Sequence, residues 1–308
     1  MDPIFPTELE REIFELTAFL RPRWMSTLIL VAQRVRTWIE PLLYRVLAIQ
    51  GSRERRRDPG TTFRLSFASV DKILQSRLAV LRLRANLRHL RFPAYCPTDY
   101  LLQILTVCET VEDLVMGPTP EDMIILPLLY NLPLQRLTIC WQSLFRAYAF
   151  DSESDQIVRM ACASLLPTHL EIRDGGFSCT GWAGLAVMPR LTHLCVHGLS
   201  GLMVQILCTA LQDCKALQAL VVSLESRPHF ASVRVMLDAD GGALTADPRF
   251  ILLLWAQYDS EYDDDWEACA RGGGVDFWAV ADRHIARRRS GETKDYIRRS
   301  DFGYVGFT

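Results

Sequence analysis

The chain contains 308 residues with a formal net charge of −2, and this near-neutral balance gives no reason to expect nucleic acid as the main partner. Hydrophobic residues make up 49% and charged residues 23% of the sequence, which is typical of a soluble globular protein with a large core. The apolar runs are too short to span a bilayer, and the acidic N-terminus is unlike a signal peptide. The nine cysteines form no C-x-x-C pair, which argues against a disulfide framework and a zinc ribbon, so we expect a cytoplasmic or nuclear location.

Residues 1–50 predict a small helical module. The first helix should begin after Pro6, with Thr7 as its cap. Its apolar face is formed by residues at helical spacing, which are Leu9, Ile13, Leu16 and Leu20. A second helix is expected from Ser26 towards Trp38, and Pro41 should restart the chain into a third helix that leads to a first, irregular strand.

Residues 51–62 form a basic segment that begins at a glycine and contains Arg53, Arg55, Arg56 and Arg57. This composition favours a solvated loop between the helical module and the rest of the chain. Contact with phosphate or with a nuclear-import receptor is the alternative interpretation.

Six stretches between residues 87 and 222 share the pattern apolar-x-x-Leu-x-apolar, where x is any residue. They read LRHLRF, VEDLVM, LQRLTI, PTHLEI, LTHLCV and LQALVV, with Pro167 as the exception at the first position, and their central leucines are Leu90, Leu114, Leu137, Leu170, Leu194 and Leu220. Successive leucines are separated by 24, 23, 33, 24 and 26 residues, near the roughly 20–29-residue period of leucine-rich repeats. The longest interval indicates an insertion around residues 145–156.

Amphipathic stretches lie between these predicted strands, and one of them reads LMVQILCTALQDCKALQAL. The repeating unit is therefore a short strand followed by a helix, and stacked units bury a continuous core. Residues 63–258 thus predict an α/β solenoid with parallel strands and outer helices. The segment resembles leucine-rich repeats of the helix-rich kind, although it lacks the asparagine that usually follows the strand.

The third and fifth positions of each predicted strand should point away from the buried leucines, toward the concave face of the solenoid. We expect the side chains at these positions to form the surface that contacts a protein target. The residues assigned to this target-binding face are His89, Arg91, Asp113, Arg136, His169, Glu171, His193 and Cys195.

Histidine and cysteine side chains also raise the question of a metal site. His193, Cys195 and His197 lie at alternate positions of one strand, and His169 should neighbour His193 across the sheet. We favour an open strand face without a metal over a zinc site, because one strand cannot easily wrap three ligands around an ion. Ser178 or Cys179 with a histidine base is a more remote hypothesis that lacks an orienting third group. We therefore expect no catalytic residue, metal or cofactor.

Residues 259–308 lose the repeat. The preceding stretch, 247–259, reads as a buried strand and is expected to be the last element of the sheet. Residues 261–267 predict a solvated acidic turn. Residues 275–289 predict an amphipathic helix, and a loosely held tail should follow from Ser290. The side chains expected on the inner face of this helix are those of Phe277, Val280, Ala281 and Ile285.

The first fifty residues resemble an F-box. The opening pattern of that family is matched by Phe5, Pro6, Glu8, Leu9, Ile13 and Phe14, and its later part is matched by Leu28, Val31, Arg34 and Pro41–Tyr44. Ala32 stands where the family usually has cysteine, and Trp38 lies three residues later than the usual tryptophan. With leucine-rich repeats following directly, the whole chain resembles a fungal F-box/leucine-rich-repeat protein.

This resemblance implies a non-enzymatic substrate receptor of a cullin-type ubiquitin ligase. The N-terminal helices would dock on the ligase adaptor subunit and so join the cullin complex, while the repeats would hold an unknown protein target, with no membrane partner. An exposed apolar patch would carry the docking, and the residues expected in it are Pro6, Leu9, Ile13, Phe14, Leu28, Val31, Pro41 and Leu42. The alternative is a leucine-rich-repeat scaffold without a ligase partner, whose N-terminal helices only cap the solenoid.

Overall fold

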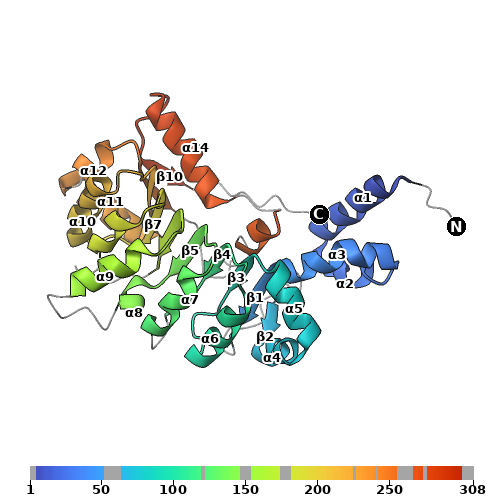
Figure 1. Ribbon diagram of the computed structural model, residues 1–308. Coiled ribbons are helices and arrows are strands. Elements are labelled where there is room, and N and C mark those ends of the chain that lie inside the picture. Colours follow the sequence, from blue (N-terminus) through green and yellow to red (C-terminus); the bar gives the residue numbers. More distant parts are fainter. Residues whose placement is uncertain are drawn as a thin grey trace. The chain divides into compact units, whose positions relative to one another are not determined.

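The computed structural model describes residues 5–51, 64–118, 122–145, 154–173, 182–224, 227–240, 242–254, 266–272 and 276–299, and Figure 1 shows its helices and strands. The chain forms two compact units. The first comprises Met1–Gly117, Asn131–Pro133 and Tyr262–Asp276, and the second comprises Pro118–Tyr130, Leu134–Glu261 and Phe277–Thr308. The strand pairs within each unit are parallel, so the α/β class with parallel strands and covering helices is confirmed. Among the described residues, no helix has both the length and the apolar character needed to cross a bilayer.

The first unit begins with a helical module that has its own core. Its elements are α1 (Thr7–Leu20), the 3-10 turn η1 (Pro22–Trp24), α2 (Met25–Leu28) and α3 (Gln33–Arg45). The buried side chains where these helices meet are Ala18, Met25, Leu28, Val35 and Ile39. Glu10 on α1 and Arg34 on α3 form an ion pair at 2.8 Å, which adds a polar contact to this apolar packing.

Three features of the module differ from those expected. The helix predicted from Ser26 towards Trp38 is interrupted after Leu28 and restarts at Gln33. Pro6 occupies the N-cap position of α1 and makes no side-chain capping hydrogen bond, so the assignment of Thr7 as the cap was wrong. α3 continues through Pro41, where a break was predicted. The carbonyl of Thr37 loses its usual helical donor at that proline, and Thr37 is exposed, so water can satisfy it.

The rest of the first unit alternates strands and helices. Its strands β1 (Val46–Gln50), β2 (Arg64–Ser66), β3 (His89–Arg91) and β4 (Asp113–Val115) pair in the order β2-β1-β3-β4. The helices are α4 (Phe67–Gln75), α5 (Arg77–Asn86) and α6 (Thr98–Val107). Ser66 and Ser76 cap α4 and α5, because their side chains accept the backbone N–H groups of Ser69 and Ala79. Residues 52–62 of the predicted basic loop lie outside the described residues.

The second unit has six strands in sequential order: β5 (Arg136–Ile139), β6 (His169–Ile172), β7 (His193–His197), β8 (Ala219–Leu224), β9 (Phe250–Leu254) and β10 (Ile297–Arg299). Its predicted central leucines form one row, because each residue pairs in register with the next: Leu137, Leu170, Leu194 and Leu220. In the first unit, Leu90 pairs with Leu114 in the same way. All six predicted strands are therefore confirmed, and their central leucines are at most 1% exposed.

Helices cover the leucine side of the second unit: η2 (Asp122–Ile125), α7 (Leu126–Tyr130), α8 (Trp141–Phe145), α9 (Ser154–Ala163), η4 (Trp182–Val187), α10 (Gly201–Asp213), α11 (Arg227–Asp240) and α12 (Gly242–Ala246). α10 buries Val204, Leu207 and Leu211 and ends at Asp213. Residues 146–153 of the predicted insertion lie outside the described residues.

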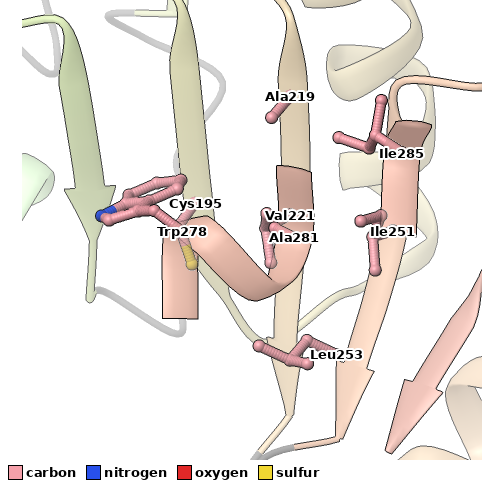
Figure 2. Packing of buried hydrophobic residues seen from close by; sticks show 8 residues of the cluster. All are labelled: Cys195, Ala219, Val221, Ile251, Leu253, Trp278, Ala281 and Ile285. Carbon is pink, nitrogen blue, oxygen red and sulfur yellow. The ribbon is translucent and has the colours of Figure 1, made fainter. Parts of the chain in front are cut away.

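Helix α14 (Phe277–Arg289) covers the other face of strands β7 to β9. Figure 2 shows Trp278, Ala281 and Ile285 of this helix pointing at the sheet. They pack with strand residues at odd positions, which are Cys195, Ala219, Val221, Ile251 and Leu253. The predicted inward positions Ala281 and Ile285 are confirmed, whereas the buried Trp278 was not anticipated. β10 follows α14 and pairs with β9, so β9 is not the last strand and residues 297–299 are not a loose tail.

Candidate functional site

The predicted target-binding face is largely closed in the second unit. Glu171, His193 and Cys195 are 2%, 6% and 1% exposed, while Arg136 and His169 are partly buried. Cys195 packs in the cluster beneath α14, and His193 contacts Trp278 and Asp282 of that helix. The expectation that all these side chains are available to a target was therefore wrong. α14 lies against His169, His193 and Cys195, and Glu171 is enclosed by its hydrogen-bond partners.

His169 and His193 are neighbours across the sheet, as expected, and their rings are stacked at a centroid distance of 4.1 Å. Both rings meet the Trp278 indole edge-on, at centroid distances of 5.1 and 5.7 Å. His193 Nε2 lies 2.9 Å from the Asp282 carboxylate. Burial, reinforced by His193 and Arg136, lowers the pKa of His169 to about 3, so this imidazole is neutral near neutral pH.

A buried carboxylate lies beside this stack. Glu171 accepts hydrogen bonds from Thr138 Oγ1 at 3.0 Å, from Arg173 Nε at 3.3 Å and from His197 Nε2 at 2.7 Å. These partners satisfy both carboxylate oxygens, which a buried charge requires. The arrangement stabilises the sheet and leaves Glu171 no open approach for a ligand.

A second possibility is a catalytic triad, in which Cys195 would be the nucleophile, His197 the base and Glu171 the acid that orients the base. Burial raises the pKa of the Cys195 thiol, and the hydrogen bond with His197 lowers it only in part. Since the thiolate is the reactive species and Cys195 is enclosed, this trio is not arranged to attack a substrate. Ser178 and Cys179 lie outside the described residues.

In the first unit, the C-terminal part of the chain again contacts the predicted face. Arg91 and Asp113 are 5% and 6% exposed. Asp113 accepts from Trp266 Nε1 at 3.2 Å and lies 3.4 Å from His89 Nδ1. Trp266 belongs to a helical turn at 266–270, so part of the predicted acidic turn is a structured contact, and residues 261–265 lie outside the described residues.

This short segment also contains an internal ion pair and makes a close approach to α1. Glu267 and Arg271 form an ion pair at 3.2 Å, with side chains only 4% and 9% exposed. Gly272 has φ of +82°, and an added Cβ would lie 2.4 Å from the ring of Phe19. The segment therefore rests against both strand β4 and helix α1, where a side chain on Gly272 would not fit. A solvated Glu267 was expected, and its burial contradicts that.

Metal binding has no support in the described part of the chain. None of its His, Cys, Asp and Glu side chains form a group of three that could hold a metal ion. The stacking of His169 on His193 explains this locally, because stacked rings face each other and do not point their nitrogens at one centre.

The predicted docking residues divide into two groups. Leu9, Ile13 and Val31 are 44%, 45% and 59% exposed, and Pro6 and Pro41 are exposed as well. In contrast, Leu28 lies in the core of the helical module, and Phe14 and Leu42 pack against that core. The expectation that Leu28 lies in an exposed patch was therefore wrong, while Phe14 and Leu42 are only partly exposed because they pack on the core of the module.

Other apolar side chains of the module are exposed without having been assigned to docking. On α1 and just after it, these are Leu16 at 55%, Leu20 at 63% and Trp24 at 58%, and Leu30 is 81% exposed after α2. The helical spacing of Leu16 and Leu20 with Leu9 and Ile13 was visible in the sequence. The structure adds that this apolar face points outward, while Ala18 carries the inward contact.

The comparisons with known proteins supply no relative. No protein-family model matches the chain, and neither a curated protein nor a solved structure matches it.

Proposed function

We propose that this chain is a protein-interaction subunit whose N-terminal helices dock on the adaptor subunit of a cullin-type ubiquitin ligase. The observation that carries the proposal is the outward apolar surface of the helical module, formed by Leu9 and Ile13 on α1 and by Leu30 and Val31 after α2. Exposed apolar patches of this kind mark protein-interaction sites. The F-box-like pattern of residues 5–44 supplies the identity of the expected partner.

The packing of the module supports a role in binding rather than in folding for these side chains. The module already has a core of buried residues around Val35 and Ile39, so its helices do not need the outer leucines to hold them together. Burying a fully exposed side chain of this kind is worth about 1.5–3 kcal/mol, so covering the exposed half of Leu9 or Ile13 is worth roughly 1 kcal/mol. A partner that covers several of them would gain enough free energy for specific binding.

Fewer residues are open to a target protein than the sequence suggested. A target would have to contact members of the predicted face that keep partial exposure, and these are His89, Arg136 and His169. The inner face of β7 to β9 is excluded, because α14 packs on it. We therefore propose target contact at these three partly exposed positions and not on the strand face that α14 covers.

Co-purification with the purified adaptor subunit tests the docking proposal. The change Leu9→Asp with Ile13→Asp should abolish binding, because it places two carboxylates in the apolar surface. Leu78→Asp with Leu81→Asp is the matched control, since these leucines are 57% and 54% exposed on α5, and it should bind normally. Circular dichroism should show the same helix content in both variants. Failure of the unaltered chain to bind the adaptor would remove the proposal.

The second candidate function is a scaffold whose N-terminal helices only cap the rest of the first unit. The contact that favours it is the ion pair between Glu40 on α3 and Arg82 on α5, at 2.8 Å, which ties the helical module to the following helices. In this case Leu9→Asp with Ile13→Asp would leave every binding partner in place, and adaptor binding would be absent from the start.

A further inference from the structure

Helix α1 has two apolar faces, and the outward one is the larger. Leu9, Ile13, Leu16 and Leu20 are 44%, 45%, 55% and 63% exposed. Ala18, on the opposite side of the helix at about 100° per residue, is fully buried against the module. The helix thus packs on α2 and α3 with one side (Figure 1). The four exposed residues lie on the other side.

The spacing of this stripe is symmetric. Its four residues are separated by four, three and four positions, which is the seam of a two-heptad coiled coil. Such a series reads the same from either end. Two antiparallel copies of α1 related by a twofold axis would therefore place Leu9 opposite Leu20 and Ile13 opposite Leu16. A closed dimer requires this kind of self-complementary surface.

The charges on the helix favour the antiparallel arrangement. On α1, Arg11 is paired with Glu15, and Glu10 is paired with Arg34 of α3. The acidic residues of the first half outside these pairs are Glu8 and Glu12, and Arg21 and Arg23 follow the last turn. Antiparallel pairing brings the acidic half of one helix beside the basic end of the other, whereas parallel pairing would bring acid beside acid. Opposed helix dipoles add to the same preference.

We propose that α1 pairs with the α1 of a second copy of this chain, antiparallel, and buries the outward stripe. The pairing itself does not depend on the ligase role. Its consequence rests on the proposed function: Leu9 and Ile13 belong to both surfaces, so the dimer and the adaptor complex exclude each other. By mass action, a high concentration of the chain would then reduce adaptor binding.

Sedimentation equilibrium of the full chain from about 1 μM to about 1 mM tests the pairing, because small interfaces associate weakly within this range. A monomer–dimer equilibrium is expected. Ile13→Glu with Leu16→Glu should raise the dimer dissociation constant at least about tenfold, while Leu81→Glu should not change it, since Leu81 is 54% exposed on α5. A monomer at every concentration, or a dimer that Ile13→Glu with Leu16→Glu leaves unchanged, would overturn the pairing.

Two further arms test the orientation. A Leu9→Cys protein mixed with a Leu20→Cys protein should form a disulfide-linked dimer on mild oxidation, with the unaltered chain as background. Neither variant alone should form this disulfide. In the antiparallel dimer, the new cysteine of one copy and the same cysteine of the other copy are eleven helical residues apart, about 16 Å, which is too far for a disulfide. Arg21→Glu with Arg23→Glu should weaken the dimer, and adding Glu8→Lys with Glu12→Lys should restore it. Crosslinking of each variant with itself, or no restoration, would overturn the antiparallel arrangement.

The two proposals can fail separately. If the adaptor binds but no dimer forms, the self-pairing is wrong and the proposed function stands. If the dimer forms but the adaptor never binds, the proposed function is wrong and the self-pairing stands.

Discussion

The imidazole rings of His169 and His193 are stacked with their planes only 11° apart, and both lie against Trp278 of α14. The two histidines come from neighbouring strands, while the tryptophan lies more than eighty positions later in the chain. This contact closes a face that the repeat pattern alone would leave open. It also makes the second unit sensitive to the ionisation of His169.

The stability of the second unit should fall when the pH drops below about 6.5. The folded state holds the pKa of His169 near 3, against an ordinary value of 6.5, so only the unfolded chain takes up this proton between those values. Between pH 6.5 and about pH 3, the free energy of unfolding should decrease by about 1 kcal/mol for each pH unit. Above pH 6.5 this contribution should stay constant. Urea unfolding at pH 7 and pH 5 measures the slope. His169→Asn should remove that contribution, and an unchanged slope would contradict the assignment.

Trp278→Ala should strongly destabilise the second unit. The indole is 4% exposed and packs in the cluster beneath α14, so its removal leaves a cavity that typically costs about 3–5 kcal/mol. The matched control is Ala279→Ser, because Ala279 is the exposed neighbour on the same helix. Chemical denaturation measures both changes, and a loss below about 1 kcal/mol for Trp278→Ala would show that α14 does not hold this face.

Glu171→Ala should cost about 2–3 kcal/mol of stability, because it leaves Arg173 without its counter-charge and His197 Nε2 without its acceptor. Glu171→Gln retains the shape and one acceptor oxygen, and it should cost less. Thermal unfolding of the two variants checks the order. Equal effects would mean that volume, rather than charge, accounts for the role of Glu171.

Cys195 should resist thiol reagents in the folded protein. Its pKa is raised by burial, and the side chain is 1% exposed beneath α14, so both thiolate formation and access are suppressed. Alkylation followed by peptide mass spectrometry should find Cys195 unlabelled in buffer and labelled in urea. Rapid labelling without denaturant would contradict the closed face.

Gly272→Ala should destabilise the first unit more than Gly291→Ala destabilises the second. Both glycines have φ near +80°, but only at Gly272 would the new methyl group meet a neighbour, the Phe19 ring. Both substitutions therefore carry the same backbone strain. The clash with Phe19 should make Gly272→Ala more destabilising than Gly291→Ala by about 1 kcal/mol. In a Phe19→Ala background this extra cost should vanish. If it remains, residues 266–272 do not rest on α1 as described.

The parallel strands could be predicted because their signal is local and repeated. Each central leucine, such as Leu137 or Leu194, recurs at a nearly constant interval, and a stacked strand–helix unit is the structure that buries such a series. The regular spacing also gave the neighbour relationship between His169 and His193. The spacing could not predict that α14 covers the other face of the sheet.

The second covering layer left a weaker signal in the sequence. Strands β8 and β9 are apolar at successive positions, as in FILLL at 250–254, and a strand buried on both faces reads this way. On β6, the polar residues His169 and Glu171 instead suggested a strand with one face exposed to solvent. The burial of His169 depends on Trp278, whose distance in sequence hides the contact.

The outward direction of the α1 stripe was equally hidden. Leu9, Ile13, Leu16 and Leu20 are the most regular apolar series on that helix, and regular apolar series usually face a core. The module instead uses Phe14 and Ala18 for its inner contacts. The sequence identifies the faces of a helix, but only packing determines which of them remains open.

Carbene footprinting of the full chain at about 1 μM, where weak self-association is negligible, tests the central claim most directly. The structure predicts strong labelling of Leu16, Leu20 and Leu30 and protection of Val221, Trp278 and Ile285. The opposite pattern, with a labelled Trp278 and a protected α1, would show that the strand face is open and the N-terminal surface closed, and it would contradict the account.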